Sequence, residues 1–489
     1  MEHKIAPRTV IKADSLRRGM IRGRYDAAQS TNENANLWSG VDALSAASAN
    51  NPNVRRIIRN RARYEVGNNS YATGIVKTLA NDVIGPRIQI QLGDNPDQQK
   101  AENDFQKWAK KIKLWAKLRT ARRSKAIDGE VFAQMFTNPK LSCAVKLDII
   151  LIECDQIESW YTSINKENEI DGIRFDAYHN PIAYRLLKCH PGDYRSFNTG
   201  KSAGTWIDAK YMLHYFDADR PGQVRGVSEI VAPLSLFGQL RAYTVAVLET
   251  ARRAAEISGV MQTDLLPDGG ISGAASLEAG TIMDYERNTI IGLPEGYKYQ
   301  GLKAEQPTNT YADFKKELIT EIGRSINMPR NVAAGDSSGY NYASGRLDHQ
   351  TYDRSIDVDR DGTETQMLDR IYPSWLADYA IRESLNMVQI ESLSDPAWFY
   401  ASRGHVDPKK EADADHVRKN DGLLTDKRYF ASQGLDSKRE KAAQIKELID
   451  GELAWNKARK DNGLPPAEYP SGLSATTEPI TEIEEKEDE

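Results

Sequence analysis

Apolar residues recur at helical spacing on both sides of a glycine-rich segment in the middle of the chain. Upstream of that segment, one helix face with three- and four-residue steps is formed by Leu236, Leu240, Tyr243 and Val247. We expect this helix to become regular beside Pro233, with Ser228 capping free N–H groups near its start. Downstream, a four-residue repeat that ends before Pro329 is formed by Phe314, Leu318, Ile322 and Ile326.

The segment between these helices, 259–308, is rich in glycine and contains strand-like pieces at 281–283 and 289–291. A second stretch of glycine and serine follows Pro329, and a third helical pattern over 345–385 should be kinked at Pro373. Two helices that leave and re-enter a body around a small β insert predict a stalk with a tip. This layout favours an assembly protein over an enzyme.

The flanking regions predict an α+β body and a helical C-terminal part. Helical patterns span 53–84 and 98–128. Short runs typical of strands lie at 87–92, 131–136, 145–152, 172–177, 182–187 and 211–215. Near the end, 407–462 is charged and helical, with breaks at Gly422 and Gly434. The predicted fold class is therefore α+β and predominantly helical.

Length and composition narrow the function classes. The 489 residues are enough for several cores. No run approaches the ~18 apolar residues of a membrane span, so we expect no membrane association. The balance of 65 basic against 70 acidic residues disfavours tight DNA binding by the whole surface. Three cysteines, Cys143, Cys154 and Cys189, cannot form a disulfide framework, which favours synthesis in a reducing cytoplasm.

None of the short motif-like strings contains all the residues that a known catalytic, metal-binding or nucleotide-binding motif requires. Asp357, Asp359 and Asp361 imitate the start of an EF-hand loop, but Leu368 stands where a bidentate glutamate belongs. The Asp128-Gly-Glu130 string is explained most simply as a turn into a strand. A solvated or subunit-contacting helix face, rather than a phosphate-binding stripe, is the favoured interpretation of Arg55, Arg56, Arg59, Arg61 and Arg63. The chain lacks a Walker A string and a GxGxxG string. We therefore expect no catalytic residue, no metal and no cofactor.

Several short stretches, in this order along about 55–440, together resemble tailed-bacteriophage portal proteins of the lambda type. They are Arg61–Gln91, Asp128–Phe132, Leu151–Asp155, Gly172–Asp176, Pro181–Tyr184, Arg225–Ser228, Asn341–Arg346, Asp407–Ala412, Gly422–Thr425 and Gly434–Asp436. No single stretch is diagnostic, and the resemblance rests on their order. The N-terminal arm and the acidic tail lie outside it.

The resemblance implies a portal-type fold whose parts follow each other along the chain. They are an N-terminal arm (1–50), an α+β wing (51–226), a first stem helix (227–258), a small β-containing clip (259–308), a second stem helix (309–328), a tunnel loop (329–345), a long wing helix with its connection (346–399), a helical crown (400–470) and an acidic disordered tail (471–489).

The same resemblance implies a ring, normally of twelve subunits, at one vertex of the phage capsid. The protein would be made in the host cytoplasm and reside in the virion. Its implied partners are the terminase large subunit, the major capsid protein and scaffold, a head–tail adaptor, and double-stranded DNA that passes without sequence specificity. The residues expected to face DNA from the tunnel loop are Arg330, Asn331, Asp336, Ser337, Ser338, Tyr340 and Asn341. Because DNA must slide, this polar composition suits weak contact better than phosphate gripping would.

Two other functions remain open at this point. A metal-dependent nucleic-acid enzyme of the phage head would use Asp357, Asp359 and Asp361. On a helix, however, these carboxylates spread over about 400° of arc at roughly 100° per residue, which argues against a shared metal. A head–tail adaptor is the weakest alternative, because adaptors are usually much shorter than this chain.

Overall fold

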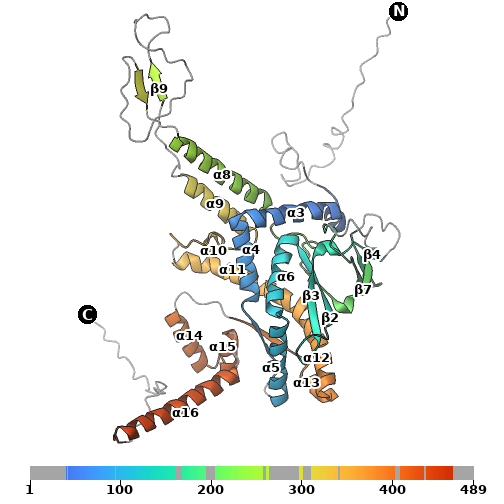
Figure 1. Cartoon of the computed structure of the whole chain (residues 1–489), viewed down its shortest axis with the longest axis vertical. Coiled ribbons are helices and arrows are strands. Elements are labelled where there is room, and N and C mark those ends of the chain that lie inside the picture. The colour runs from blue at the N-terminus through green and yellow to red at the C-terminus, as the bar shows by residue number, and fades with distance from the viewer. Residues whose placement is uncertain are drawn as a thin grey trace, which may run out of the picture.

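The computed structural model describes residues 40, 42–93, 95–159, 168–193, 204–256, 260–263, 297–300, 310–339, 342–401, 408–433 and 437–465. The expected strands at 281–283 and 289–291, the acidic tail and nearly all of the N-terminal arm lie outside these residues. Figure 1 shows an elongated molecule: two helices project from the body at one end, and α16 lies toward the other. No helix in the described part is long and apolar enough to cross a membrane.

Two helices expected to be continuous are each divided in two. Residues 53–84 form α3 (Pro52–Asn68) and α4 (Ser70–Ile84), because Asn69 takes an extended conformation and its side chain caps α4 by accepting from two N–H groups. Residues 98–128 form α5 (Pro96–Lys111) and α6 (Leu114–Asp128), separated at Lys113 with φ of 57°. A short α2 (Ala46–Ala49) precedes α3. Both breaks follow from local backbone conformation that a hydrophobic repeat does not report.

Antiparallel strands form four small sheets. The three-stranded sheet has the order β3-β2-β8, and the four-stranded sheet has the order β4-β5-β6-β7. Their strands are β2 (Glu130–Thr137), β3 (Leu147–Ile152), β4 (Glu169–Ile170), β5 (Ile173–Phe175), β6 (Pro181–Leu186), β7 (Thr205–Asp208) and β8 (Met212–Phe216), with short 3-10 turns η2 (Cys154–Gln156) and η3 (Ala209–Tyr211). Two-stranded sheets pair β1 (Ile88–Gln91) with β11 (Ala397–Tyr400), and β9 (Val260–Thr263) with β10 (Tyr297–Gln300).

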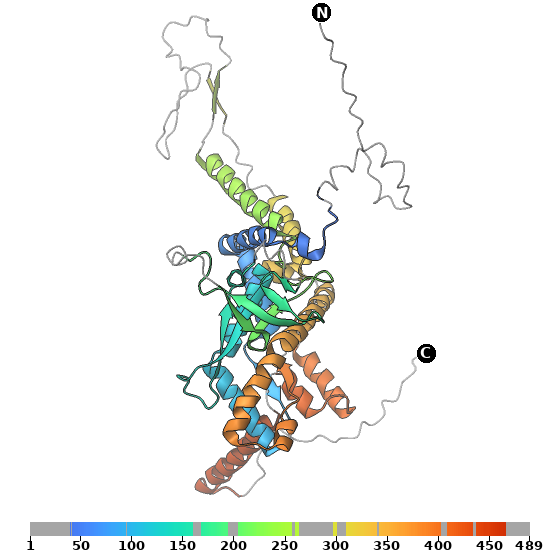
Figure 2. The ribbon, with the colours of Figure 1, turned by 90° about the vertical axis from the view of Figure 1, so that its right-hand side faces the viewer.

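The projecting pair consists of α8 (Leu234–Glu256) and α9 (Thr310–Arg324), which pack side by side (Figures 1 and 2). The rings of Tyr243 and Tyr311 lie 5.6 Å apart across this pair. The start of α8 beside Pro233 is as expected, but the role expected for Ser228 is wrong. Ser228 is buried six residues before the helix, and its hydroxyl donates to the Ala126 carbonyl at 3.1 Å.

The third helical pattern is interrupted one turn before its proline. It comprises α11 (Tyr342–Thr363), a π-helical turn η4 (Glu364–Leu368) and α12 (Asp369–Glu383), which contains Pro373. The remaining elements are α10 (Arg330–Ala334), α13 (Met387–Ser392), α14 (Pro408–Asn420), α15 (Asp426–Ser432) and α16 (Ser437–Asp461). Gly422, at φ of 71°, lies in the predicted break between α14 and α15, whereas Gly434 lies outside the described residues.

The main core joins α5, α12 and β11 through an aromatic cluster. Its members are Phe105, Trp108, Tyr372, Trp375 and Trp398, and the Phe105 and Trp375 rings meet edge to face at 5.2 Å. The Trp108 indole N–H donates to the Leu147 carbonyl, so the burial of this large side chain leaves no polar atom unpaired. This core holds α12 against α5 and β11.

Candidate functional site

The segment expected to face DNA begins as a short helix and becomes an exposed turn. Residues 330–334 form α10, with buried Pro329 before it and Gly335 after it in the left-handed conformation at φ of 66°. Residues 335–339 are exposed. The expectation of a loop throughout 329–345 is therefore wrong for its first part, because α10 packs against α4 and α9 and buries Ala333.

The residues predicted for this site divide into three groups. Arg330 and Asn331 lie on α10, and the Asn331 amide donates to His349 Nε2 of α11 at 2.9 Å. The exposed turn holds Asp336, Ser337 and Ser338. The Asp336 carboxylate accepts from the Ser338 N–H at 2.8 Å. Hydrogen bonding by the Ser338 side chain and by this N–H lowers the pKa of the carboxyl. Tyr340 and Asn341 lie outside the described residues.

A tight turn anchors α10 to the end of α9. The Met328 N–H donates to the Gly323 carbonyl at 2.9 Å, and a Cβ added at Gly323 would lie 2.6 Å from the Met328 carbonyl oxygen. Asn327 adopts the left-handed conformation at φ of 55°, which asparagine tolerates better than most residues. The exposed turn therefore rests on a firmly packed base.

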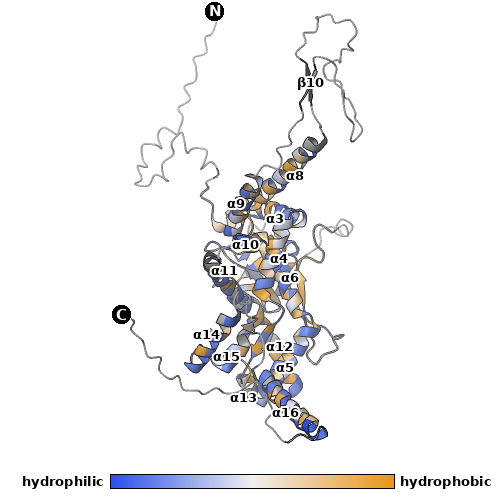
Figure 3. Ribbon diagram, turned by 90° about the vertical axis from the view of Figure 1, so that its left-hand side faces the viewer, coloured by the Kyte–Doolittle hydropathy of each residue, from blue (hydrophilic) through white to orange (hydrophobic). Residues whose placement is uncertain are grey.

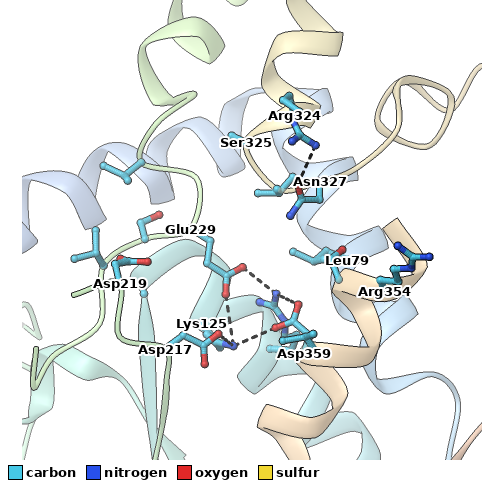
Figure 4. Close-up of a pocket in the computed structure, with 18 of the residues that line it drawn as sticks. Leu79, Lys125, Asp217, Asp219, Glu229, Arg324, Ser325, Asn327, Arg354 and Asp359 are labelled. Carbon is cyan, nitrogen blue, oxygen red and sulfur yellow. Dashed lines mark hydrogen bonds and ion pairs between the residues drawn. The ribbon is translucent and has the colours of Figure 1, made fainter. Parts of the chain in front are cut away.

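A cleft of about 750 Å³ lies beside this base, between the end of α9, α11 and the segment 217–231. Its floor is an ion cluster in which Arg122 and Lys125 of α6 meet Glu229 and Asp359 (Figure 4). The Arg122 guanidinium lies 2.9 Å from Glu229 and 2.7 Å from Asp359. Burial opposes ionisation of Asp359, but Arg122 and Lys125 outweigh it and lower the pKa of this carboxyl.

A lysine already lies among the carboxylates of this floor. Oxygens of Asp217, Glu229 and Asp359 lie within 4.8 Å of one another, a spacing that could hold a metal ion. The Lys125 ammonium lies among them, 2.6 Å from Asp217, 3.8 Å from Glu229 and 3.2 Å from Asp359. Together with Arg122, Lys125 thus supplies two positive charges against these three carboxylates.

The three aspartates that imitate an EF-hand start have separate surroundings. All lie on the helix α11, as their sequence pattern predicts. Asp359 belongs to the buried cluster, whereas Asp357 is exposed and pairs with Arg360 at 3.6 Å. Asp361 is exposed near Glu364, whose pKa it helps to raise. The fold thus spreads these carboxylates around the helix.

A second buried charge cluster, centred on Glu130, was not foreseen. Its carboxylate is fully buried and accepts from Arg225 Nε at 2.8 and 3.0 Å and from the Gly226 N–H at 3.0 Å. Arg59 of α3 and His214 of β8 also donate to it, the latter at 2.9 Å. Because an ionised carboxylate only accepts, His214 Nε2 carries the proton. Together these contacts join α3, β2, β8 and the segment before α8.

The pKa values at this cluster follow from burial and charge. Burial alone would raise the pKa of Glu130, but Arg225 and Arg59 outweigh it and hold the pKa well below its ordinary value. Burial lowers the pKa of His214, which Glu130 only partly offsets. The His214 ring is also stacked between Phe132 and Phe216, with centroids 4.2 and 4.1 Å away. The cluster is therefore one carboxylate held by two guanidinium groups.

These contacts correct the interpretation of the arginines on α3. Arg55 and Arg59 are buried and Arg63 is half-buried, and they pair with Asp171, Glu130 and Asp128 respectively. Only Arg56 and Arg61 are exposed. The sequence does indicate which arginines are buried together, because Arg55, Arg59 and Arg63 recur every four residues and so share one face of the helix. The partners, however, come from segments about 65–116 residues away.

The comparisons with known proteins agree on one family. A family model described as phage portal protein, lambda family, matches residues 34–360, more than half of the chain. A protein described as a probable portal protein of Halomonas phage phiHAP-1 is 24% identical over 412 residues, covering 78% of this chain and 77% of that protein.

Solved structures of related description are more distant in sequence. A chain from the neck of an empty gene transfer agent particle is 12% identical, with a TM-score of 0.42 and coverage of 76% of this chain and 91% of that chain. An HK97-family phage portal protein from Corynebacterium diphtheriae is 10% identical, with a TM-score of 0.29 and coverage of 59% and 85%.

Proposed function

The chain belongs to the lambda family of phage portal proteins, and from this premise we propose that it forms a ring at one vertex of a tailed-phage capsid. Double-stranded DNA passes through the ring during packaging and ejection. The match of the family model over 34–360 carries this proposal, because it includes the projecting helices, α10 and most of α11. The protein therefore resides in the virion.

Each part of the chain has a place in the proposed ring. The helices α8 and α9 form the stem, 259–308 the clip, the elements before α8 the wing, and α14 to α16 the crown. The projecting pair supports this assignment: Val245 and Leu248 of α8 and Phe314 of α9 are exposed apolar residues on a two-helix unit that has little core of its own. Such residues are more readily accommodated when neighbouring copies cover them.

The turn at 335–339 faces the DNA in this proposal. Its exposed charge is the Asp336 carboxylate, and Arg330 lies at the start of α10. A turn with so few cations neutralises few phosphates, and so contributes little salt-dependent affinity. DNA can therefore slide past it, held weakly and without sequence specificity.

The same ring serves as a platform for other components. The clip and stem present a surface for the terminase large subunit during packaging and for a head–tail adaptor afterwards. The wing contacts the major capsid protein and scaffold. Portal proteins are structural components, and we assign no catalytic role. The enzyme alternative is weakened because Asp357, Asp359 and Asp361 have separate surroundings.

Native mass spectrometry with negative-stain imaging tests the proposal. The purified chain, alone and co-expressed with capsid and scaffold proteins, should give rings with a central hole and about twelve subunits, since closed symmetry is the rule for such assemblies. A monomer or compact dimer under both conditions contradicts the proposal. Cleavage of plasmid DNA with magnesium would favour the enzyme alternative instead.

A further inference from the structure

Exposed lysines gather where α5 ends beside the loop that joins β2 to β3. The Trp108 indole N–H of α5 donates to the Leu147 carbonyl at the start of β3, at 2.8 Å, which holds the helix against this loop. Burial raises the pKa of Cys143 in the loop, and Lys146 and Lys111 oppose the rise, so ammonium groups from both segments lie near one thiol. We call the four exposed lysines of this region the lysine patch: Lys110, Lys111, Lys113 and Lys140.

No carboxylate forms an ion pair with this patch within the described part of the chain. Two carboxylates of the same segments, Asp104 and Asp148, are engaged by other lysines, at 2.9 and 2.8 Å respectively. The exposed Arg382 adds a further cation, because its guanidinium donates to the Ala144 carbonyl of the loop at 3.1 Å. The region therefore has an excess of positive charge.

The ends of the helices do not account for all of these lysines. A cation near the C-terminus of a helix is favourable, which suits Lys110 and Lys111 in the last turn of α5. Lys113, however, is the N-cap residue of α6, the end at which a positive charge is unfavourable. Lys140 lies in a loop. Because like charges gathered together repel one another, the patch suits a partner with several negative charges.

The chain contains a segment of matching charge. Residues 482–489 lie outside the described residues and contain six acidic residues and one lysine, and no other eight-residue stretch of the sequence has as many acidic residues. Pro465, the last described residue, stands 17 residues before Glu482. A chain of that length spans up to about 56 Å, at about 3.3 Å per residue. Figures 1 and 3 both place α5, and α16 which precedes this segment, toward the end of the molecule opposite the projecting helices.

We propose that the acidic segment 482–489 binds the lysine patch of its own chain. Tethering favours this occupant, because an attached segment has an effective concentration in the millimolar range, whereas any other polyanion must be supplied from outside. The contact needs only one chain, so it does not depend on the proposed ring. It would also keep these lysines from neutralising DNA phosphates, which suits a protein past which DNA slides.

Carbodiimide coupling of the full chain tests the contact directly, because the reagent joins a carboxylate to an amine where the two groups touch. Mass spectrometry of the digested product should find 482–489 linked mainly to the lysine patch. The control is internal, since α16 carries three exposed lysines that are closer to the segment in sequence: Lys446, Lys457 and Lys460. In a dilute mixture of isotope-labelled and unlabelled chains, both halves of each link should carry the same label.

A labelled peptide of residues 478–489 provides a quantitative readout by fluorescence anisotropy. In the tail variant E482Q/E484Q/E485Q/E487Q, the patch should be free to bind this peptide. If the peptide binds at about 0.1 mM and the tethered segment acts at about 1 mM, the unaltered chain should bind the peptide about tenfold more weakly than the tail variant. Binding should also weaken as salt is raised, because the contact lies on the surface.

Charge reversal within the tail variant identifies the site of binding. Addition of K110E/K111E/K140E should abolish peptide binding, whereas addition of the matched control K446E/K457E/K460E should leave it unchanged. Circular dichroism melting of each variant should match the unaltered chain, which separates lost binding from lost folding.

Three results would overturn the inference. The first is a set of links that favours the α16 lysines, spreads evenly over exposed lysines or joins different labels. The second is peptide binding that is equal in the unaltered chain and the tail variant, or that survives K110E/K111E/K140E. The third is a short DNA duplex that binds the patch equally well in both chains, which would assign the lysines to nucleic acid instead. Ring formation is measured separately, so failure of this contact leaves the proposed function intact.

Discussion

Replacement of Glu130 by glutamine should destabilise the chain strongly although it barely changes the size of the side chain. Glu130 is fully buried and neutralises Arg225 and Arg59, which are themselves buried. Breaking one partner of a buried ion pair typically costs about 3–5 kcal/mol, because a charge is left uncompensated. At about 2–4 °C per kcal/mol for a domain of this size class, the melting temperature should fall by about 6–20 °C.

The pH dependence gives this prediction a specific signature. The pKa of Glu130 is held well below its ordinary value, so its stabilisation is complete above the ordinary pKa of about 4.3 and is lost as pH falls through the folded-state pKa. Glutamine does not titrate there. The difference in melting temperature between the two proteins should therefore be constant from pH 7.5 to about 5 and should narrow at lower pH.

Differential scanning calorimetry over this pH range measures both effects. The matched control is Glu383→Gln, which removes a carboxylate from a surface ion pair with Lys100 and should cost about 0–1 kcal/mol. A Glu130→Gln melting temperature within 2 °C of the unaltered chain would refute the reasoning. A difference that stays constant down to pH 3.5 would show that the ionised carboxylate is not its source.

Three further changes have defined outcomes. Burial and neighbouring carboxylates raise the pKa of Glu364 to about 7, so its ionisation lowers stability as pH rises from about 4.3 to 7. Melting curves at pH 5 and 8 should show Glu364→Gln gaining about 1–2 kcal/mol at the higher pH, allowing for its partial exposure, and exposed Glu391→Gln gaining none. A Cβ at Gly226 would lie 2.0 Å from the Gly129 carbonyl oxygen, so Gly226→Ala should give little soluble protein, whereas Gly74→Ala, in a helix with open space around it, should express far better in a solubility assay. Shortening 335–339 should change the amount of DNA packaged or retained, measured per particle, while rings still form; failure of the rings would show that this turn is structural.

The pattern of apolar residues predicted the elements of this fold better than their boundaries. The start of α8 beside Pro233 follows from proline's missing N–H, which acts locally. The helix α9, in contrast, ends at Arg324, five residues before Pro329, because the chain turns at Asn327. The breaks at Asn69 and Lys113 depend on single residues that leave helical conformation while the apolar repeat continues. Short strands such as β4 and β7 were missed because their pairing, not their composition, defines them.

The candidate site, too, could be predicted from the sequence only in part. The polar, glycine-containing turn at 335–339 could be recognised from composition, because exposure of such residues is a local property. The short helix α10 could not, because it depends on packing of Ala333 against α4 and α9. Glu130 was interpreted as part of a turn, since nothing near it in sequence reveals that Arg59, His214 and Arg225 converge on it.

Both buried charge clusters take a residue from one short segment of the chain. Arg59 and Arg225 tie the buried side of α3 to Glu130, while Glu229, four residues after Arg225, lies in the floor of the cleft. The two clusters are thus connected through the segment 225–229, which is held by the Gly226 N–H donating to Glu130 and by the Ser228 hydroxyl donating to the Ala126 carbonyl. A ring of identical subunits closes symmetrically only if the angle between the two contacting sides of each subunit is the same in every copy. Buried ion pairs are directional, and apolar residues of similar volume often replace such pairs without great loss of stability. We propose that they hold this angle constant in the proposed ring, and Glu130→Gln should then lower the ring fraction even at temperatures where the subunit remains folded.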